Sequence, residues 1–293
     1  MKNAAYQLFA ERDSGESGTV LVGLLGSGIA ASRTPAMHER EGKEHGLTYI
    51  YKLLDLDELG AHANDLSNLL SLARLFGFSG LNVTHPCKKA VIPLLDELSS
   101  EAKVLSAVNT VVFSHGKSIG HNTDWSGFSE AFRRNLADAP REHVVQFGAG
   151  GAGAAVGYAL LSLGTNTLSV VDVDPARSQE LSKTLCNAFG EGRAHVGTQA
   201  DLANAQGVVN TTPMGTIKYP GTPFDIDLLC AEHWVADIVY FPLETELLRK
   251  AKARGCRTMG GGDMAVFQAV EAFRLFTGKA ADVDRMMRHF EQM

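Results

Sequence analysis

Residues 144–161 read VVQFGAGGAGAAVGYALL, and this stretch decides the fold class. A short apolar run comes first, a glycine-rich turn follows, and apolar residues at helical spacing come after it. In the pattern G-x-G-x-x-G, glycines permit a tight turn and let backbone N–H groups approach a pyrophosphate at a helix N-terminus. A glycine turn without a ligand is the alternative, but the strand before it and the helix after it favour a dinucleotide site. The site would comprise Gly148, Ala149, Gly150, Gly151, Ala152 and Gly153.

The next predicted strand, residues 168–173, places Asp172 about 20 residues after Gly153. An acid at this position accepts hydrogen bonds from the adenosine ribose and repels a 2′-phosphate. Asp174 is a candidate cap for the helix that follows. Arg177, in the first turn of that helix, could instead meet a 2′-phosphate, or it could simply be a solvated arginine. The sequence favours NAD over NADP.

Before and after the glycine-rich turn, short apolar runs alternate along the chain with longer segments that show the spacing of helices. Strands are predicted at residues 20–25, 48–54, 79–83, 109–113, 168–173, 207–210 and 235–239. The strand at 109–113 is expected to turn through residues 114–117 into a short partner strand. Such alternation is typical of an α/β chain with largely parallel sheets. We expect two α/β domains, an N-terminal substrate-binding domain and a Rossmann dinucleotide-binding domain. An amphipathic helix with Phe128, Phe132 and Leu136 would connect them, with a ligand cleft between.

Composition narrows the class of protein. The net charge is −6, and no block of Lys or Arg offers a nucleic acid a basic face. No apolar run approaches the roughly 20 residues that span a bilayer. The first residues lack the apolar segment of a secretory signal and are interpreted as a loose extension before the first strand. We expect a cytoplasmic enzyme with a small-molecule partner and no nucleic-acid or membrane partner.

Cysteine and histidine spacing argues against a metal. The four cysteines are scattered without a C-x-x-C pair, which favours free thiols in a reducing compartment. The ten histidines are also spread out, and none stands at metal-ligand spacing from a second ligand type. We therefore expect no metal.

Several polar loops are candidates for the chemistry. Oxidation of an alcohol needs a group that takes the hydroxyl proton. Lys88 and Asp124 could form such a pair, although a solvated lysine and a helix cap are the ordinary alternatives, and His85 and His121 are rivals. Residues 32–35, Ser-Arg-Thr-Pro, could bind a carboxylate with hydroxyls and helix N–H groups, or be an ordinary cap. Residues 210–215 follow a strand end and could line a nicotinamide or be a plain turn.

Taken together, these segments resemble the shikimate/quinate dehydrogenase family over nearly the whole chain from about Val20. The matching pieces are S-R-T-P (32–35), N-V-T-H-P-C-K (82–88), A-V-N-T (107–110), N-T-D (122–124), G-A-G-G-A-G (148–153), N-T-T-P-M-G (210–215), and the regions of Tyr240 and Gln268. The resemblance is closest to NAD-linked quinate/shikimate dehydrogenases of actinobacterial type. Those share the S-R-T motif and an acid where NADP-linked members carry Asn-Arg-Thr.

The resemblance implies roles for individual residues. Three would hold the substrate carboxylate: Ser32, Thr34 and Tyr240. Four would hydrogen-bond the ring hydroxyls: Asn82, Thr84, Asn109 and Gln268. Lys88 would transfer the proton, and Asp124 would orient it. Further cofactor contacts would come from Thr211, Pro213, Met214 and Gly261.

The closing helices, residues 264–293, would return to the first domain. The substrate-binding domain would then comprise residues 1–124 and 264–293, and the NAD-binding domain residues 125–263.

The sequence thus predicts an NAD-dependent dehydrogenase of shikimate or quinate, interconverting a ring hydroxyl and the ketone of 3-dehydroshikimate or 3-dehydroquinate. Residues 260–263, Gly-Gly-Gly-Asp, depart from the family pattern and leave open a related alicyclic acid such as an amino-shikimate. A non-catalytic sensor of NAD or a metabolite is a second alternative, although a sensor needs neither Lys88 nor Asp124. A monomer or a homodimer fits equally well.

Overall fold

The structure, a computed structural model, describes residues 18–293. The extension expected at the N-terminus lies outside the described residues. The chain forms two compact units. The first runs to Thr123 and resumes with Ala269–Met293, and the second is Asp124–Gln268.

A mixed six-stranded sheet forms the centre of the first unit, with strand order β2-β1-β3-β5-β6-β4. The strands are β1 (Thr19–Gly26), β2 (Thr48–Asp55), β3 (Gly80–Val83), β4 (Glu97–Leu98), β5 (Thr110–Ser114) and β6 (Lys117–His121). β2, β1 and β3 run parallel, whereas β5 and β6 form the antiparallel hairpin that the sequence predicts after residue 109. β4 was not predicted, because two residues are too short to show a period.

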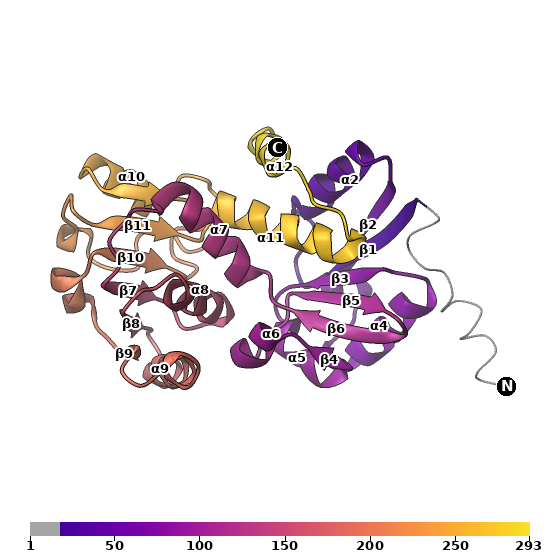
Figure 1. Cartoon of the computed structure of the whole chain (residues 1–293), viewed down its shortest axis with the longest axis horizontal. Coiled ribbons are helices and arrows are strands. Elements are labelled where there is room, and N and C mark those ends of the chain that lie inside the picture. Colours follow the sequence, from indigo (N-terminus) through magenta and orange to yellow (C-terminus); the bar gives the residue numbers. More distant parts are fainter. Residues whose placement is uncertain (1–17) are drawn as a thin grey trace. The chain divides into compact units, whose positions relative to one another are not determined.

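Short helices cover this sheet (Figure 1). They are α2 (Thr34–Glu44), α3 (Leu56–Leu59), α4 (Leu66–Leu75), α5 (Cys87–Ala90), α6 (Ser100–Leu105), and the 3₁₀ turns η1 (Ala63–Asp65) and η2 (Ile92–Leu94). One face packs Leu25 and Leu81 against Leu66 and Leu70 of α4. Burying such side chains contributes roughly 1.5–3 kcal/mol each.

The end of the chain forms two helices, α11 (Gly261–Thr277) and α12 (Val283–Glu291), where the sequence predicts helix throughout residues 264–293. Gly278, with φ of +69°, ends α11, and the Asp282 side chain caps α12 by accepting from the N–H of Arg285. Phe273 of α11 stacks on Tyr49 with ring centroids 5.4 Å apart. The part of α11 from Ala269 onward and the whole of α12 thus belong to the first unit, whereas the beginning of α11 belongs to the second.

A salt bridge attaches α12 to α2. The carboxylate of Glu41 is buried and accepts from Arg285 Nε at 2.9 Å and Nη2 at 2.6 Å. Burial alone would raise the pKa of Glu41, but these bonds and one from the N–H of Asp282 outweigh it and hold the pKa below its ordinary value. Arg33, just before α2, lies over the ring of Phe290. The start of α2 is therefore braced by the chain terminus.

The second unit contains a parallel sheet with strand order β12-β11-β10-β7-β8-β9, the order of a Rossmann fold (Figure 1). Its strands are β7 (His143–Phe147), β8 (Thr167–Val171), β9 (Ala194–Val196), β10 (Gly207–Asn210), β11 (Trp234–Asp237) and β12 (Arg257–Met259). Its helices are α7 (Asp124–Leu136), α8 (Gly151–Ser162), α9 (Pro175–Phe189), α10 (Glu246–Ala253), and the 3₁₀ turns η3 (Gln199–Asn204) and η4 (Ile226–Leu228). The two edge strands β9 and β12 were not predicted, since each has three residues.

Trp234 fixes one end of this sheet. Its ring occupies the space beside Gly207, where an added Cβ would approach ring atom Cε2 to 1.9 Å. Its Nε1 donates to the carbonyl of Pro140 over 2.7 Å, and Phe132 of α7 meets it edge-on at 5.1 Å. The connecting helix predicted from Phe128, Phe132 and Leu136 is therefore packed into the core of the second unit.

Membrane-spanning helices and metal-binding groups are both absent from residues 18–293. Within them, no helix combines the length and the apolar character that crossing a membrane would require. In the same part of the chain, no group of three or more His, Cys, Asp or Glu side chains could hold a metal ion.

Candidate active site

The glycine turn lies between β7 and α8, with helix N-cap Gly150. Gly148 has φ of +104°, and a Cβ on it would meet the Thr211 hydroxyl at 2.6 Å. On Gly153, a Cβ would meet the carbonyl of Gly148 at 2.3 Å. Beside Gly150 and Gly151, in contrast, nothing lies within 4 Å of an added Cβ. Two glycines therefore close the turn, and the other two leave its backbone open to a pyrophosphate, which fits a dinucleotide.

Two side chains brace this turn from below. Thr211 Oγ1 donates to the carbonyls of Phe147 and Gly148 at 2.8 and 2.9 Å. Gln146 Nε2 donates to the carbonyls of Gly148 and Gly153, both at 2.9 Å. Sequence reasoning assigned Thr211 to the cofactor itself, and its hydroxyl proton is engaged with the main chain in this structure. Sequence reasoning missed Gln146, although a polar amide within an apolar strand was a signal that could have identified it.

Asp172 follows the last residue of β8. Its Oδ2 accepts from the N–H of Ala149 in the glycine turn at 2.7 Å, and its Oδ1 accepts from the N–H of Asp174 at 2.9 Å. A carboxylate oxygen has a second lone pair, so both oxygens can still accept from a ribose hydroxyl. Asp174 caps α9 by accepting from the N–H of Ala176, and the Arg177 Nε lies 3.5 Å from its carboxylate. An acid therefore faces Arg177 at this end of β8.

Further candidates of the second unit lie in the loops after β10 and β11 and at the start of α11. Asn210 Nδ2 donates to the carbonyl of Met214 at 2.9 Å, which folds residues 210–215 back on themselves around Pro213. Tyr240 is 46% exposed. Gly261 begins α11, and a Cβ there would lie 2.2 Å from the carbonyl of Ile238. Packing against the loop after β11 thus explains this glycine without a ligand.

Gln268, a candidate for the substrate, and Asp263, which departs from the family pattern, both lie on α11. Asp263 accepts a hydrogen bond from Asn135 Nδ2 of α7 at 2.6 Å, and an acid in a first helical turn is favourable. Asp263 therefore has a local partner that accounts for it. Gln268 Nε2 donates to the carbonyl of Ala265.

In the first unit, the carboxylate candidates lie where β1 leads into α2. Ser32 Oγ accepts from the N–H of Thr34 at 3.3 Å, and Thr34 is the first residue of the helix. Both side chains are half-buried. Two hydroxyls at a helix N-terminus suit a carboxylate.

Sequence reasoning missed the residue that holds this loop. Asp55, at the end of β2, accepts from the N–H groups of Gly28 at 3.0 Å and Ile29 at 2.8 Å. Burial would raise the pKa of Asp55, but the main-chain hydrogen bonds win and lower it. An acid that ends an apolar strand was the only signal for this role.

Asn82 and Asn109 belong to one buried hydrogen-bond network. Asn82 Nδ2 donates to the Thr110 hydroxyl at 3.0 Å and to the carbonyl of Asn109 at 3.4 Å. The Oδ1 of Asn109 accepts from the N–H of Thr123 at 2.7 Å. Tyr51, which no sequence motif singled out, donates to Asn82 Oδ1.

The proton-transfer candidates lie on segments that adjoin this network. Lys88, half-buried on α5, accepts a main-chain bond from Val108 at 2.9 Å. Asp124 comes directly after Thr123 and is 9% exposed. Thr84 is half-buried one residue beyond β3. In the first unit, the structure therefore brings together the segments that carry Asn82, Lys88 and Asn109.

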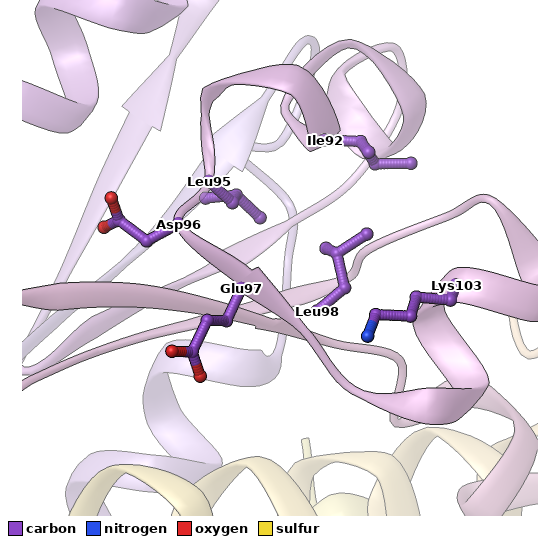
Figure 2. A pocket seen from close by; sticks show the side chains of 6 residues that line it. All are labelled: Ile92, Leu95, Asp96, Glu97, Leu98 and Lys103. Carbon is purple, nitrogen blue, oxygen red and sulfur yellow. The ribbon is translucent and has the colours of Figure 1, made fainter.

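The rival histidines are in different surroundings. His85 is exposed. Burial lowers the pKa of His121, and Glu271 and Glu101 oppose this effect. A pocket on the surface of the first unit, drawn in Figure 2, is lined by Ile92, Leu95, Asp96, Glu97, Leu98 and Lys103. None of these six was predicted as a site residue, so this pocket is separate from the candidates.

Family models match both ends of the chain. Residues 24–111 match the shikimate dehydrogenase substrate-binding domain, and residues 261–289 match the shikimate 5′-dehydrogenase C-terminal domain. A shikimate dehydrogenase (NADP(+)) of Streptomyces avermitilis is 52% identical over 93% of this chain and 95% of its own length. The chain belongs to the shikimate dehydrogenase family. It is therefore an oxidoreductase, as the sequence resemblance implies.

Other relatives in the family carry a different cofactor in their names. A quinate/shikimate dehydrogenase (NAD(+)) of Corynebacterium efficiens is 50% identical over 93% of this chain and 98% of its own length. The structure of a quinate dehydrogenase from Corynebacterium glutamicum in complex with NAD superimposes with a TM-score of 0.89 at 48% identity, covering 94% of this chain and 99% of that one. Sequence identity to these relatives therefore does not decide whether this chain uses NAD or NADP.

Proposed function

We propose that this chain is an NAD-dependent dehydrogenase of quinate or shikimate. The observation that carries the choice of cofactor is Asp172, whose carboxylate is held at the glycine turn by the N–H of Ala149. A carboxylate there accepts from two ribose hydroxyls but repels a 2′-phosphate. The nearby Arg177 is paired with Asp174, whose charge offsets its own and weakens its attraction for a 2′-phosphate.

The chain's residues divide the work of binding. Residues 148–153 would hold the pyrophosphate, and Pro213 and Met214 would flank the nicotinamide. When bound, the dinucleotide supplies or accepts the hydride. Ser32, Thr34 and Tyr240 would bind the carboxylate of the acid. Residues 1–124 with 264–293 would serve the substrate, and residues 125–263 the dinucleotide.

Lys88 of the first unit and Asp124, the first residue of the second unit, would carry out the proton transfer. Lys88 would take the proton from the ring hydroxyl as the ketone forms and return it in the reverse direction. Asp124 would orient the lysine. Asn82, Thr84, Asn109 and Gln268 would bind the other hydroxyls, so that the reacting carbon is presented in one orientation.

A panel assay tests the proposal. Shikimate, quinate and an amino-shikimate are each offered with NAD and with NADP, and the absorbance of the reduced nicotinamide is followed. We expect turnover of quinate or shikimate with NAD, at a kcat/KM above that with NADP. Equal or better rates with NADP would contradict the assignment of NAD as cofactor. Turnover of the amino-shikimate alone would contradict quinate and shikimate as substrates. Tight NAD binding without any turnover would show that the chain is not a dehydrogenase of these acids.

A further inference from the structure

Asp237 is a buried acid that the proposed function does not use. It ends β11 in the second unit, and its side chain is only 1% exposed. Burial raises the pKa of this carboxyl, while hydrogen bonds from Thr245, Val239 and Asn210 act in the opposite direction. A carboxylate is costly to bury, so its partners matter.

The Oδ1 atom of Asp237 contacts the loop after β10. It accepts from Asn210 Nδ2 at 2.9 Å, and the same amide nitrogen donates to the carbonyl of Met214 at 2.9 Å. The Oδ1 of Asn210 accepts from both the N–H and the hydroxyl of Thr212. Asp237 thus orients the amide that shapes residues 210–215, which we call the cofactor loop.

The Asp237 carboxylate also contacts the loop after β11, residues 238–245, which we call the Tyr240 loop. Its Oδ1 accepts from the N–H of Val239 at 3.0 Å, and its Oδ2 accepts from the Thr245 hydroxyl at 2.6 Å. The Thr245 hydroxyl in turn caps α10 by accepting from the N–H of Leu248. Both ends of the Tyr240 loop are therefore attached to one carboxylate.

The two loops also meet directly. Gly215 has φ of +99°, and a Cβ on it would lie 3.4 Å from the Cβ of Thr245 and 3.8 Å from Oδ2 of Asp237. The last residue of the cofactor loop therefore packs against the last residue of the Tyr240 loop, with Asp237 beside both.

We propose that Asp237 is a positioning residue that holds the cofactor loop and the Tyr240 loop as one piece, and so couples the site of the nicotinamide to the site of the acid. This inference rests on the proposed function of the two loops. Oδ1 contacts both loops, whereas Oδ2 contacts only Thr245 of the Tyr240 loop, so the bond at Thr245 can be removed separately.

The experiment uses the full chain and four variants. Asp237→Ala removes both attachments. Thr245→Val removes only the hydroxyl at the Tyr240 loop, Thr245→Ser restores a hydroxyl there, and Asp225→Asn is a matched control at an exposed acid that caps η4. Kd for NADH and NADPH is measured by fluorescence, KM for quinate and shikimate by absorbance, and main-chain hydrogen exchange by mass spectrometry.

Asp237→Ala should raise both Kd for the preferred nucleotide and KM for the acid by roughly three- to tenfold each, the scale of one lost hydrogen bond. Thr245→Val should raise KM for the acid alone, and Thr245→Ser should recover it. Exchange should speed up in both loops in Asp237→Ala but only in the Tyr240 loop in Thr245→Val. A purely structural role would instead lower the melting temperature and leave the ligand constants of the folded protein unchanged.

Folded Asp237→Ala protein with both constants within twofold of wild type overturns the inference, as does faster exchange in one loop only. If Asp237→Ala does not fold, Asp237→Asn takes its place. Its amide oxygen can still accept from Asn210, whereas its amide nitrogen can no longer accept from Thr245 and can only donate to that hydroxyl, so any change in exchange should be confined to the Tyr240 loop. If wild type turns over neither acid, the proposed function fails, whereas nucleotide binding and exchange still decide the role of Asp237.

Discussion

The hydroxyl of Tyr51 donates a hydrogen bond to Oδ1 of Asn82 over 2.8 Å, and both residues are buried. Burial raises the pKa of Tyr51 well above its ordinary value, so the phenol stays protonated and remains a donor. Both donor positions of the Asn82 amide are taken by Thr110 and the carbonyl of Asn109. What Asn82 can offer a substrate is therefore the second lone pair of Oδ1, which makes it an acceptor for a ring hydroxyl.

Tyr51→Phe tests this orientation. Removing one hydroxyl leaves Oδ1 of Asn82 without its fixed donor, so we expect KM for the acid to rise about three- to tenfold, the effect of roughly 1 kcal/mol. KM for NAD should not change. The control is Tyr219→Phe, which removes the hydroxyl of an exposed tyrosine in the second unit. An unchanged KM for the acid in Tyr51→Phe would mean that Asn82 needs no such support.

Lys88→Ala tests the proton transfer. Removing a positioned acid–base group lowers kcat by about 10²–10⁴-fold, so we expect a loss of this size with NADH affinity retained. Lys89→Ala is the matched control, since Lys89 is the exposed neighbour on the same short helix. Steady-state rates on the better acid give the comparison, and nearly full kcat in Lys88→Ala would remove Lys88 from the mechanism.

Asp172→Ser tests the choice of cofactor. The serine removes the charge that would repel a 2′-phosphate, and it retains only one hydroxyl for the ribose. We expect the ratio of kcat/KM for NADP to that for NAD to rise about tenfold or more, which corresponds to roughly 1.4 kcal/mol. Glu180→Gln, which removes an exposed acid from α9, should leave the ratio unchanged. The same ratio in Asp172→Ser and wild type would refute the role of this acid.

Much of the fold could be predicted because its signals are local. The glycine turn and the strands beside it are each defined by a few consecutive residues. Together with the alternation of strands and helices, they predict a Rossmann domain. The three strands that were missed, β4, β9 and β12, have two or three residues each. A period of two residues cannot be recognised over such a length.

The supporting residues of the site could not be predicted, because their partners lie far away in the sequence. Asp55 of β2 binds the N–H of Ile29 in the loop after β1. Tyr51 of β2 binds Asn82 of β3, and β1 lies between these two strands in the sheet. Asp237 reads as an ordinary strand end until the fold brings Asn210 beside it. Motifs show the residues that could touch a ligand, whereas the residues that orient them emerge only from the strand register.

Asp55→Asn tests the support of the carboxylate loop. The side-chain amide accepts only through its oxygen. Its nitrogen is a donor and would face the main-chain N–H of Gly28 or Ile29, which would lose its acceptor. We expect a higher KM for the acid, through displacement of Ser32, and an unchanged Kd for NADH. Since the folded-state pKa of Asp55 is lowered, its contribution is complete above the ordinary carboxyl pKa and is lost as pH falls through the lowered value. Asp57→Asn, at an exposed acid on α3, is the control, and equal KM values in the two variants would contradict this role.

His38 should make stability depend on pH. It is fully buried between Tyr49 and Tyr51, and burial lowers its pKa to about 3. An unfolded histidine has a pKa near 6.5, so between about pH 6.5 and 3 the unfolded chain binds a proton that the folded chain does not. The free energy of unfolding should therefore fall as pH decreases, by at most about 1.4 kcal/mol per pH unit from this group.

His38→Gln should reduce that slope. The Tyr49 hydroxyl lies 2.9 Å from His38 Nδ1, and a glutamine amide can hydrogen-bond this hydroxyl as either donor or acceptor, but it does not titrate. Urea unfolding at intervals between pH 6 and 4 measures the slope for wild type, His38→Gln and the exposed control His62→Gln. The glutamine costs stability at pH 7, so the comparison rests on the slope and not on the absolute value. Parallel curves for wild type and His38→Gln would show that His38 binds a proton in the folded chain as readily as in the unfolded one.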